Sequence, residues 1–245
     1  MSAEAKVVGI TGAGTGIGAA TAVLLAAQGH PVVLAARRRH RIDEVVARIR
    51  AEGGVALSVV TDVTHYADME NLVAEAVREF GRLDVLVNNA GVAKTGLIAD
   101  RDISGWTAMI DVNFRGVLHG IAAALPVFRE QGRGHFVTTI STSGLKIVPS
   151  QGVYAATKNA VRTLLEAFRQ ENTDGVIRTT SISPGYVATE LADTIEDDAL
   201  RAEIQKSMAD FGLDAAAVAR AIAFAIEQPV DVEVGDITIR PTVQS

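Results

Sequence analysis

A tyrosine and a lysine four positions apart carry the first chemical signal in the sequence. Tyr154 and Lys158 stand in the segment Tyr-Ala-Ala-Thr-Lys, at the start of a helix that the pattern predicts over residues 154–170. Residues four apart share one face of a helix, so the ammonium is expected beside the phenol. A free phenol has a pKa of about 10, and a neighbouring ammonium lowers that pKa toward the range useful for acid–base catalysis. Such a pair is also common by chance, so a purely structural role stays open at this point.

Polar side chains at predicted strand ends support the chemical interpretation. Ser141 follows the strand predicted over residues 135–140, and Asn89 follows the strand predicted over residues 85–87. Doubly wound α/β folds bind their ligands at the carboxyl ends of such strands. Asn113 lies inside a predicted helix with apolar neighbours, where its amide must either bond backbone or hold a water molecule.

A glycine-rich turn connects the first predicted strand to the first predicted helix. Its sequence is Thr11-Gly12-Ala13-Gly14-Thr15-Gly16-Ile17-Gly18. Glycines let the backbone turn sharply and approach a pyrophosphate, and the following helix offers free N–H groups and a partial positive charge. Between a first strand and a first helix, the turn indicates a dinucleotide site. The alternative is a tight strand–helix turn without a ligand.

The end of the second predicted strand indicates which nicotinamide cofactor fits. A free ribose 2′-hydroxyl is usually held by a carboxylate at this point. The strand ends instead in Ala36, followed by Arg37, Arg38 and Arg39. Guanidinium groups pair with phosphate in two-pronged hydrogen bonds, so the sequence predicts NADP(H), with Arg37 on its 2′-phosphate. Arg39 is interpreted as the exposed start of the next helix.

Short apolar strands alternate with helical segments along the chain. The strands are predicted over residues 7–10, 32–35, 56–60, 85–87, 135–140, 179–182 and 236–240, and the helices over residues 18–28, 41–51, 67–79, 106–129, 154–170 and 215–227. Several strands are apolar at every position, as in parallel sheets covered on both faces. We therefore predict an α/β fold of the doubly wound Rossmann type, with a predominantly parallel seven-stranded sheet flanked by helices on both faces. Residues 1–245 are expected to form a single domain, with a substrate-lid insertion at about 188–213.

Composition limits the class of protein. The chain has 245 residues, 48% of them apolar, and a formal net charge of −6, which argues against a nucleic-acid-binding protein. There is no cysteine, and the five histidines share no ligand spacing, so no metal site is predicted. No apolar run is long enough to span a membrane and no signal peptide is recognised, so a cytoplasmic protein is expected.

Taken together, the motifs resemble those of the short-chain dehydrogenase/reductase family, in its single-domain branch. The resemblance covers residues 7–240 and rests on five motifs in the family's order: T-G-x-x-x-G-I-G at 11–18, Asp62-Val63, N-N-A-G at 88–91, Ser141 with Tyr154 and Lys158, and Pro184-Gly185-x-Val187-x-Thr189. It implies an NADP(H)-dependent oxidoreductase that transfers a hydride between the nicotinamide and a carbonyl or secondary alcohol. The substrate would be a ketone, an aldehyde or a 3-oxo/3-hydroxy acid.

The same resemblance assigns roles to individual residues. Tyr154 would be the general acid/base on the substrate oxygen, and Ser141 would orient that oxygen. Lys158 would lower the tyrosine pKa and bind the nicotinamide ribose, and Asn113 would hold a water of a proton relay. The implied cofactor-binding residues are Gly12, Gly14, Thr15, Gly16, Ile17, Gly18, Arg37, Arg38, Asp62, Val63, Asn89, Ala90, Gly91, Tyr154, Lys158, Pro184, Gly185, Val187 and Thr189. NADP-selecting relatives carry a basic residue just before the second glycine of the motif, where this chain has Thr15. Selection of NADP(H) would therefore depend on Arg37, with Arg38.

Three points stay open in the sequence. The first is a rival class, a non-catalytic NADP(H)-sensing protein on the same fold; an extended-branch epimerase or dehydratase is disfavoured by the glycine spacing. The second is the assembly, a homodimer or homotetramer by resemblance. The third is which substrate the pocket accepts. The pocket is expected to be formed by residues 92–97, by residues 145–148 and by the lid. Lys94 and Lys146 are candidate anchors for an anionic group of the substrate.

Overall fold

The computed structural model describes residues 5–146 and 148–244. Within them seven strands form one sheet in the order β3-β2-β1-β4-β5-β6-β7, and every neighbouring pair is parallel. The strands are β1 (Val8–Thr11), β2 (Val32–Ala36), β3 (Ala56–Val60), β4 (Val85–Asn88), β5 (Gly134–Thr139), β6 (Ile177–Pro184) and β7 (Asp236–Ile239). The predicted doubly wound, seven-stranded Rossmann-type sheet is thus confirmed.

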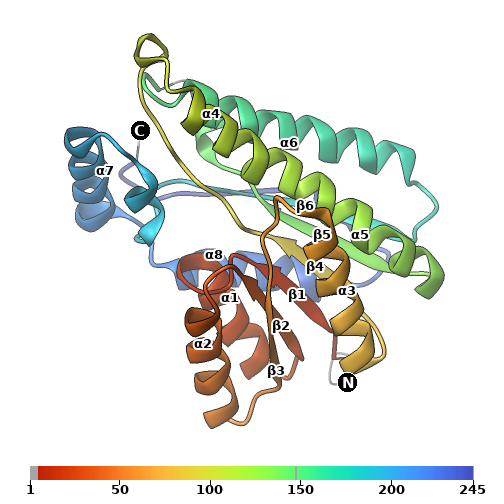
Figure 1. Ribbon diagram of the computed structural model, residues 1–245. Coiled ribbons are helices and arrows are strands. Elements are labelled where there is room, and N and C mark those ends of the chain that lie inside the picture. The colour runs from red at the N-terminus through yellow and green to blue at the C-terminus, as the bar shows by residue number, and fades with distance from the viewer. Residues whose placement is uncertain (1–4, 147, 245) are drawn as a thin grey trace.

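Helices cover both faces of the sheet (Figure 1). They are α1 (Gly16–Ala27), α2 (Arg39–Ala51), α3 (Tyr66–Phe80), α4 (Ile103–Met109), α5 (Gly116–Gln131), α6 (Gly152–Glu171), α7 (Asp198–Phe211) and α8 (Ala215–Glu227), with short helical turns η1 (Ile98–Asp100), η2 (Ile110–Arg115), η3 (Thr142–Gly144) and η4 (Glu190–Thr194). None of the helices in the part of the chain that the structure describes is long and apolar enough to cross a membrane.

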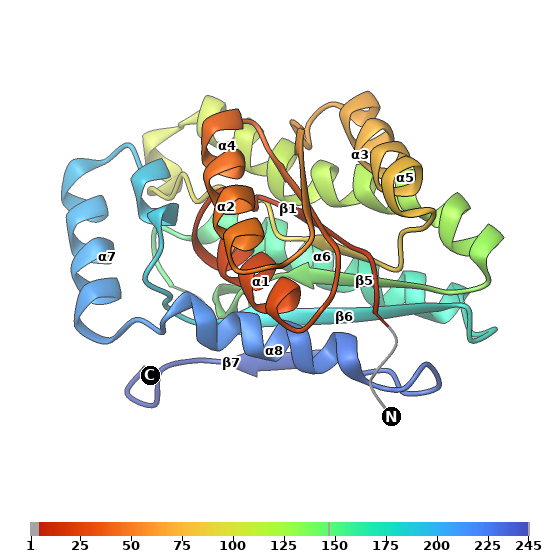
Figure 2. The same cartoon turned by 90° about the horizontal axis from the view of Figure 1, so that it is seen from below.

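Alternate residues of each strand supply two apolar cores. In β2, Val32 and Leu34 belong to a core that also includes residues of α1, α2 and α8, whereas Val33 and Ala35 belong to a core that also includes residues of α3, α5 and α6. Both sets are buried, which explains why the strand is apolar at every position. The second view shows the same layers from below, with α1 and α8 on one side of the sheet and α3 and α5 on the other (Figure 2).

One predicted helix differs from the structure. Residues 106–129 were expected to form a regular helix, but the run from α4 to α5 is interrupted by η2, a π-helical turn. A π turn holds one extra residue and often marks a functional position. This turn carries Asn113 inward, where it is 1% exposed.

Residues 188–213 lie outside the β–α alternation. They contain η4 and α7, and their buried residues Ala192, Ile195 and Ile204 form a small apolar cluster of their own. A parallel bridge between Val187 and Leu213 joins the two ends of the segment. The segment is therefore closed at its base and has a small apolar cluster of its own (α7 in Figure 1).

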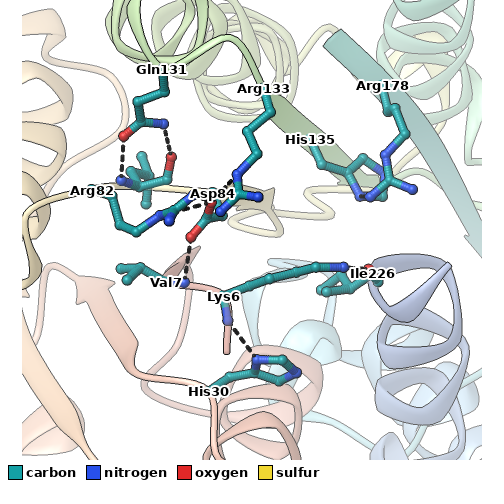
Figure 3. Close-up of polar contacts among 11 residues, drawn as sticks. Lys6, Val7, His30, Arg82, Asp84, Gln131, Arg133, His135, Arg178 and Ile226 are labelled. Carbon is teal, nitrogen blue, oxygen red and sulfur yellow. Dashed lines mark hydrogen bonds and ion pairs between the residues drawn. The ribbon is translucent and has the colours of Figure 1, made fainter. Parts of the chain in front are cut away.

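The amino ends of the central strands are held by Asp84, which is 5% exposed (Figure 3). Its carboxylate accepts hydrogen bonds from the Val7 amide at 2.9 Å and from Arg82 Nε at 3.0 Å, and it pairs with Arg133 Nε at 3.3 Å. Its own amide donates to the Val7 carbonyl, and its carbonyl accepts from the His135 amide. One buried carboxylate thus connects β1, β4 and β5 at the edge opposite the candidate site.

Beside Asp84, Lys6 binds the carboxyl end of α8 and Arg178 binds the loop that follows it. Lys6 Nζ donates to the Ile226 carbonyl, and Arg178 Nη1 donates to the carbonyls of Pro229 and Val232 at 3.0 and 2.8 Å. Cations near the last carbonyls of a helix are favourable. Burial lowers the pKa of His135 well below its usual range, so the ring is neutral between Arg178 and Thr180.

Candidate active site

Tyr154 and Lys158 lie in the first two turns of α6, on the face that packs against the sheet. Tyr154 is 8% exposed and Lys158 is 5% exposed. Lys158 Nζ donates to the Thr139 carbonyl at the end of β5, at 2.9 Å, and lies 5.8 Å from the centre of the Tyr154 ring. The expected juxtaposition of phenol and ammonium is present.

The pKa of Tyr154 moves in the opposite direction from the expected one. Burial raises the pKa of the phenol to about 12, and the Ser141 hydroxyl that hydrogen-bonds it lowers it in part. Burial also lowers the pKa of Lys158 to about 8. Desolvation disfavours the charged form of each group and is the largest cause of both shifts. The phenol is therefore protonated at neutral pH.

Ser141 lies where β5 ends and η3 begins. Its hydroxyl accepts a hydrogen bond from the Ser143 amide at 3.0 Å, which fixes the start of η3, and it contacts Tyr154. Ser143, the other serine near the end of β5, donates its hydroxyl proton to Gln151 Oε1 at 2.8 Å. The structure thus places Ser141 with the tyrosine and directs Ser143 to Gln151.

Asn113 is engaged with backbone next to this group. Its side chain accepts from the Val92 amide and donates to the Val92 carbonyl, both at 2.9 Å, and Nδ2 lies 3.3 Å from Thr157 Oγ1. A Cβ built on Gly91 would come within 3.4 Å of Asn113 Oδ1 and 3.6 Å of Lys158 Nζ. The sequence left open whether this amide bonds backbone or holds a water molecule, and the structure shows bonds to backbone.

The glycine turn has the close packing that a dinucleotide cradle needs. Gly12 has a φ of +65°, and a Cβ there would lie 2.9 Å from Ala90 Cα. A Cβ on Gly18 would lie 2.4 Å from the Gly12 carbonyl oxygen. Asn89 supports the turn by donating to the Thr11 carbonyl at 3.0 Å. Residues at the start of α1, Gly16 and Ile17, line the cleft, and a helix N-terminus in this place fits a pyrophosphate.

One cleft of about 1140 Å³ connects the glycine turn with Tyr154. Many of the residues that the sequence singled out line it: Gly12, Gly14, Thr15, Gly16, Ile17, Arg37, Arg38, Asp62, Val63, Asn89, Ala90, Gly91, Ser141, Tyr154, Lys158, Pro184, Gly185, Val187 and Thr189. Gly18 and Asn113 support its wall from behind, through Gly12 and Val92. The donor set fits a nicotinamide dinucleotide, with the glycine turn at one point and exposed guanidinium groups at another.

The cleft also contains residues that the sequence did not single out. Arg41 follows the three arginines and pairs with Glu190, at the start of η4. Gln244 accepts from the Tyr186 amide at 2.9 Å and so attaches the C-terminal segment to the loop after β6. An arginine-rich helix start could have indicated Arg41, whereas nothing local in the sequence indicates that Gln244 reaches Tyr186.

Apolar side chains dominate the end of the cleft beyond Tyr154. They are Leu145, Val148, Leu191, Ile195, Ile204, Met208 and Phe211. Lys94 pairs with Glu196, and Lys146 has a partner of its own, so neither is a free anchor for an anion. Ile147, in the expected substrate loop, lies outside the described residues. No group of three potential ligands for a metal ion occurs in the described ranges.

Comparison with known proteins places the chain in a family. The sequence profile of the short chain dehydrogenases matches residues 6–200. An uncharacterized oxidoreductase of Listeria innocua is 42% identical over 246 residues, covering 100% of this chain and 99% of the relative. An alcohol dehydrogenase from Thermococcus sibiricus, solved with 5-hydroxy-NADP, has a TM-score of 0.88 at 28% identity and 99% coverage of both chains. A short-chain dehydrogenase/reductase from Burkholderia phymatum, solved with NAD, has a TM-score of 0.88 at 30% identity, covering 97% of this chain and 90% of that one.

A matching family profile, full-length relatives and solved structures of the same fold thus agree with the motifs and the cleft. The chain belongs to the short-chain dehydrogenase/reductase family and is an oxidoreductase.

Proposed function

We propose that the protein is an NADP(H)-dependent oxidoreductase that transfers a hydride between the nicotinamide and a carbonyl or secondary alcohol. The observation that carries this proposal is the meeting of Ser141, Tyr154 and Lys158 at the inner end of a cleft whose other end holds the glycine turn and Arg37. The apolar pocket beyond Tyr154 favours a ketone or aldehyde over a small 3-oxo acid, since Lys94 is engaged with Glu196.

Tyr154 is the proposed proton donor in carbonyl reduction. NADPH held in the cleft would supply the hydride that the carbonyl carbon receives. The phenolic proton goes to the carbonyl oxygen, which yields the alcohol. The raised pKa of Tyr154 keeps the phenol in the form that can donate, and the Ser141 hydroxyl lies beside it to orient the same oxygen. In alcohol oxidation Tyr154 would accept the proton instead.

Lys158 and Asn113 are proposed to support Tyr154 and to help bind the cofactor. The Lys158 ammonium is held between the Thr139 carbonyl and the Tyr154 ring and lines the cleft, where it would bind the nicotinamide ribose. As an ammonium it stabilises the phenolate left after proton transfer. Asn113 fixes the backbone of Val92 at the wall of the cleft. We also propose that it holds a water molecule of a proton relay.

A panel of ketones, aldehydes and 3-oxo acids with NADPH tests the proposed function. Loss of the near-ultraviolet absorbance of the reduced nicotinamide is expected with at least one carbonyl class, and the product should be the matching alcohol. Tight NADPH binding with no turnover of any carbonyl or alcohol in either direction would favour the non-catalytic sensing protein instead.

The pH dependence of reduction is expected to follow Lys158. Its pKa is about 8, so the ammonium is present below that pH and is lost above it, whereas Tyr154, with a pKa of about 12, stays protonated throughout. We expect kcat/KM for reduction to be level near neutral pH and to fall as pH rises through about 8. A kcat/KM that rises across this interval would contradict the assignment.

The preference for NADP(H) is assigned to Arg37. This residue is exposed at the end of β2, lines the cleft and faces Asp62, whose pKa it helps to lower. Removing a charge-assisted contact to the 2′-phosphate costs about 1.5–3 kcal/mol. Arg37→Ala is therefore expected to raise the Kd for NADPH about 10- to 100-fold and to leave the Kd for NADH within about twofold.

Arg39→Ala provides the matched control for this measurement. Arg39 lies two positions after Arg37 and is also exposed, but it is not among the residues that line the cleft. Calorimetric titration should show unchanged NADPH binding for this control. Equal weakening of NADPH by both substitutions would indicate a diffuse effect of charge, and wild-type binding of NADH as tight as NADPH would remove the argument for NADP(H).

We further propose a homodimer or homotetramer in the cytoplasm. An open apolar groove formed by η1, η2 and the first half of α6 supports contact between copies; it is lined by Ile98, Ile110, Phe114, Val153 and Ala160.

A further inference from the structure

Glu190, the first residue of η4, pairs with two arginines across the cofactor end of the cleft. Its Oε2 lies 3.2 Å from Arg38 Nη2, and its Oε1 lies 3.7 Å from Arg41 Nη2. Arg38 is the residue before α2, and Arg41 lies in the first turn of that helix. All three side chains line the cleft. The carboxylate therefore connects the start of the 188–213 segment with the end of β2.

This contact lies beside the glycine turn. The Cβ of Arg41 is 3.1 Å from the position that a Cβ on Gly14 would take, and Thr189 Cγ2 is 3.0 Å from the corresponding position on Gly16. Residues on both sides of the Glu190 contact thus pack against the turn that would hold the pyrophosphate. The guanidinium groups that Glu190 engages lie within the region expected to receive the 2′-phosphate.

The 188–213 segment has two further kinds of attachment. At its base, the Ala188 amide donates to the Leu213 carbonyl and the Leu213 amide donates to the Tyr186 carbonyl, both at 2.9 Å. On the substrate side, Thr194 Oγ1 accepts from the Ala93 amide at 2.9 Å, and Glu196 pairs with Lys94. The contact of Glu190 with the two arginines is the attachment on the cofactor side.

We propose that Glu190 is a specificity-determining residue that competes with the 2′-phosphate of NADP(H) for Arg38 and Arg41. A carboxylate and a phosphate use the same donors of a guanidinium, so both cannot occupy them fully. Binding of NADP(H) displaces the carboxylate and frees the start of the 188–213 segment, whereas NAD(H), with a 2′-hydroxyl, leaves the pair in place. Glu190 thus lowers the preference for NADP(H) that the arginines alone would give; this inference rests on the proposed NADP(H)-dependent function.

Glu190→Gln tests the competition by titration of NADPH and NADH in the full-length protein. Both ion pairs involve exposed side chains, and such pairs are weak because solvent screens them. The Kd for NADPH is expected to fall about two- to tenfold, and the Kd for NADH to stay within about 1.5-fold. Glu196→Gln, on the same segment but paired with Lys94, is the matched control and should change neither Kd.

A double-mutant comparison separates competition from other effects. In an Arg38→Ala/Arg41→Ala background the carboxylate has no guanidinium to occupy, so Glu190→Gln is expected to leave NADPH affinity unchanged. Unchanged or weaker NADPH binding in the single Glu190→Gln variant overturns the inference, and so does equal tightening of NADPH and NADH. The proposed function is tested separately, by the wild-type ratio of NADPH to NADH affinity and by turnover.

Discussion

Tyr154→Phe is expected to lower kcat for carbonyl reduction about 100- to 10,000-fold and to leave NADPH binding close to that of the wild type. The substitution removes the phenolic oxygen and keeps the ring, which is buried with Ala93 and Met109. A positioned proton donor contributes a factor of about 10²–10⁴ to rate. Because the removed hydroxyl acts on the substrate oxygen and the ring that lines the cleft is kept, the loss should appear in kcat rather than in the Kd for NADPH.

Tyr66→Phe is the matched control for that measurement. Tyr66 is 40% exposed at the start of α3, outside the cleft as described, so its variant should keep wild-type kcat and stability. Single-turnover kinetics with NADPH and the best carbonyl of the panel would separate the chemical step from product release. A Tyr154→Phe enzyme with full kcat would remove the proposed mechanism, whatever its substrate.

The sheet was predictable from the sequence because its strands are buried on both faces. Val32, Val33, Leu34 and Ala35 alternate between two cores, and such a run is readable without knowledge of its neighbours. The π turn at Asn113 was not predictable in this way. In this turn the Asn113 side chain hydrogen-bonds the backbone of Val92, which is distant in the sequence. The helical periodicity of a sequence does not indicate such long-range contacts.

The cleft was predictable to the extent that local motifs form it. The glycine turn, Arg37 and the Tyr154 helix each occupy one continuous segment, and the parallel sheet brings their strand ends to one edge. The direction of the Tyr154 pKa was wrong, because charge proximity is visible in the spacing and depth of burial is not. Glu190 was missed for a related reason, since its partners lie about 150 positions away in the chain, in the arginine-rich start of α2.

Asp84→Asn is expected to lower the free energy of unfolding by about 2–4 kcal/mol. Breaking a buried ion pair costs about 3–5 kcal/mol, and the cost is smaller here because the Arg82 and Arg133 side chains are 32% and 37% exposed. Asparagine retains one acceptor but adds an NH₂ donor, and both arginine Nε donors bond the same carboxylate oxygen (Figure 3). The substitution therefore removes the negative charge. It also places the new NH₂ donor opposite an N–H donor that the carboxylate had accepted from, at the point where β1, β4 and β5 begin.

Urea unfolding at one fixed protein concentration measures this effect, because assembly would make the midpoint depend on concentration. The midpoint of Asp84→Asn should fall while the slope stays the same. Glu52→Gln removes an exposed carboxylate paired with Arg48 and should shift stability by no more than about 0.5 kcal/mol. The candidate active site lies at the opposite edge of the sheet, so the folded Asp84→Asn variant should bind NADPH normally. An unchanged midpoint would mean that the Val7 and His135 backbone bonds alone hold the strand ends together.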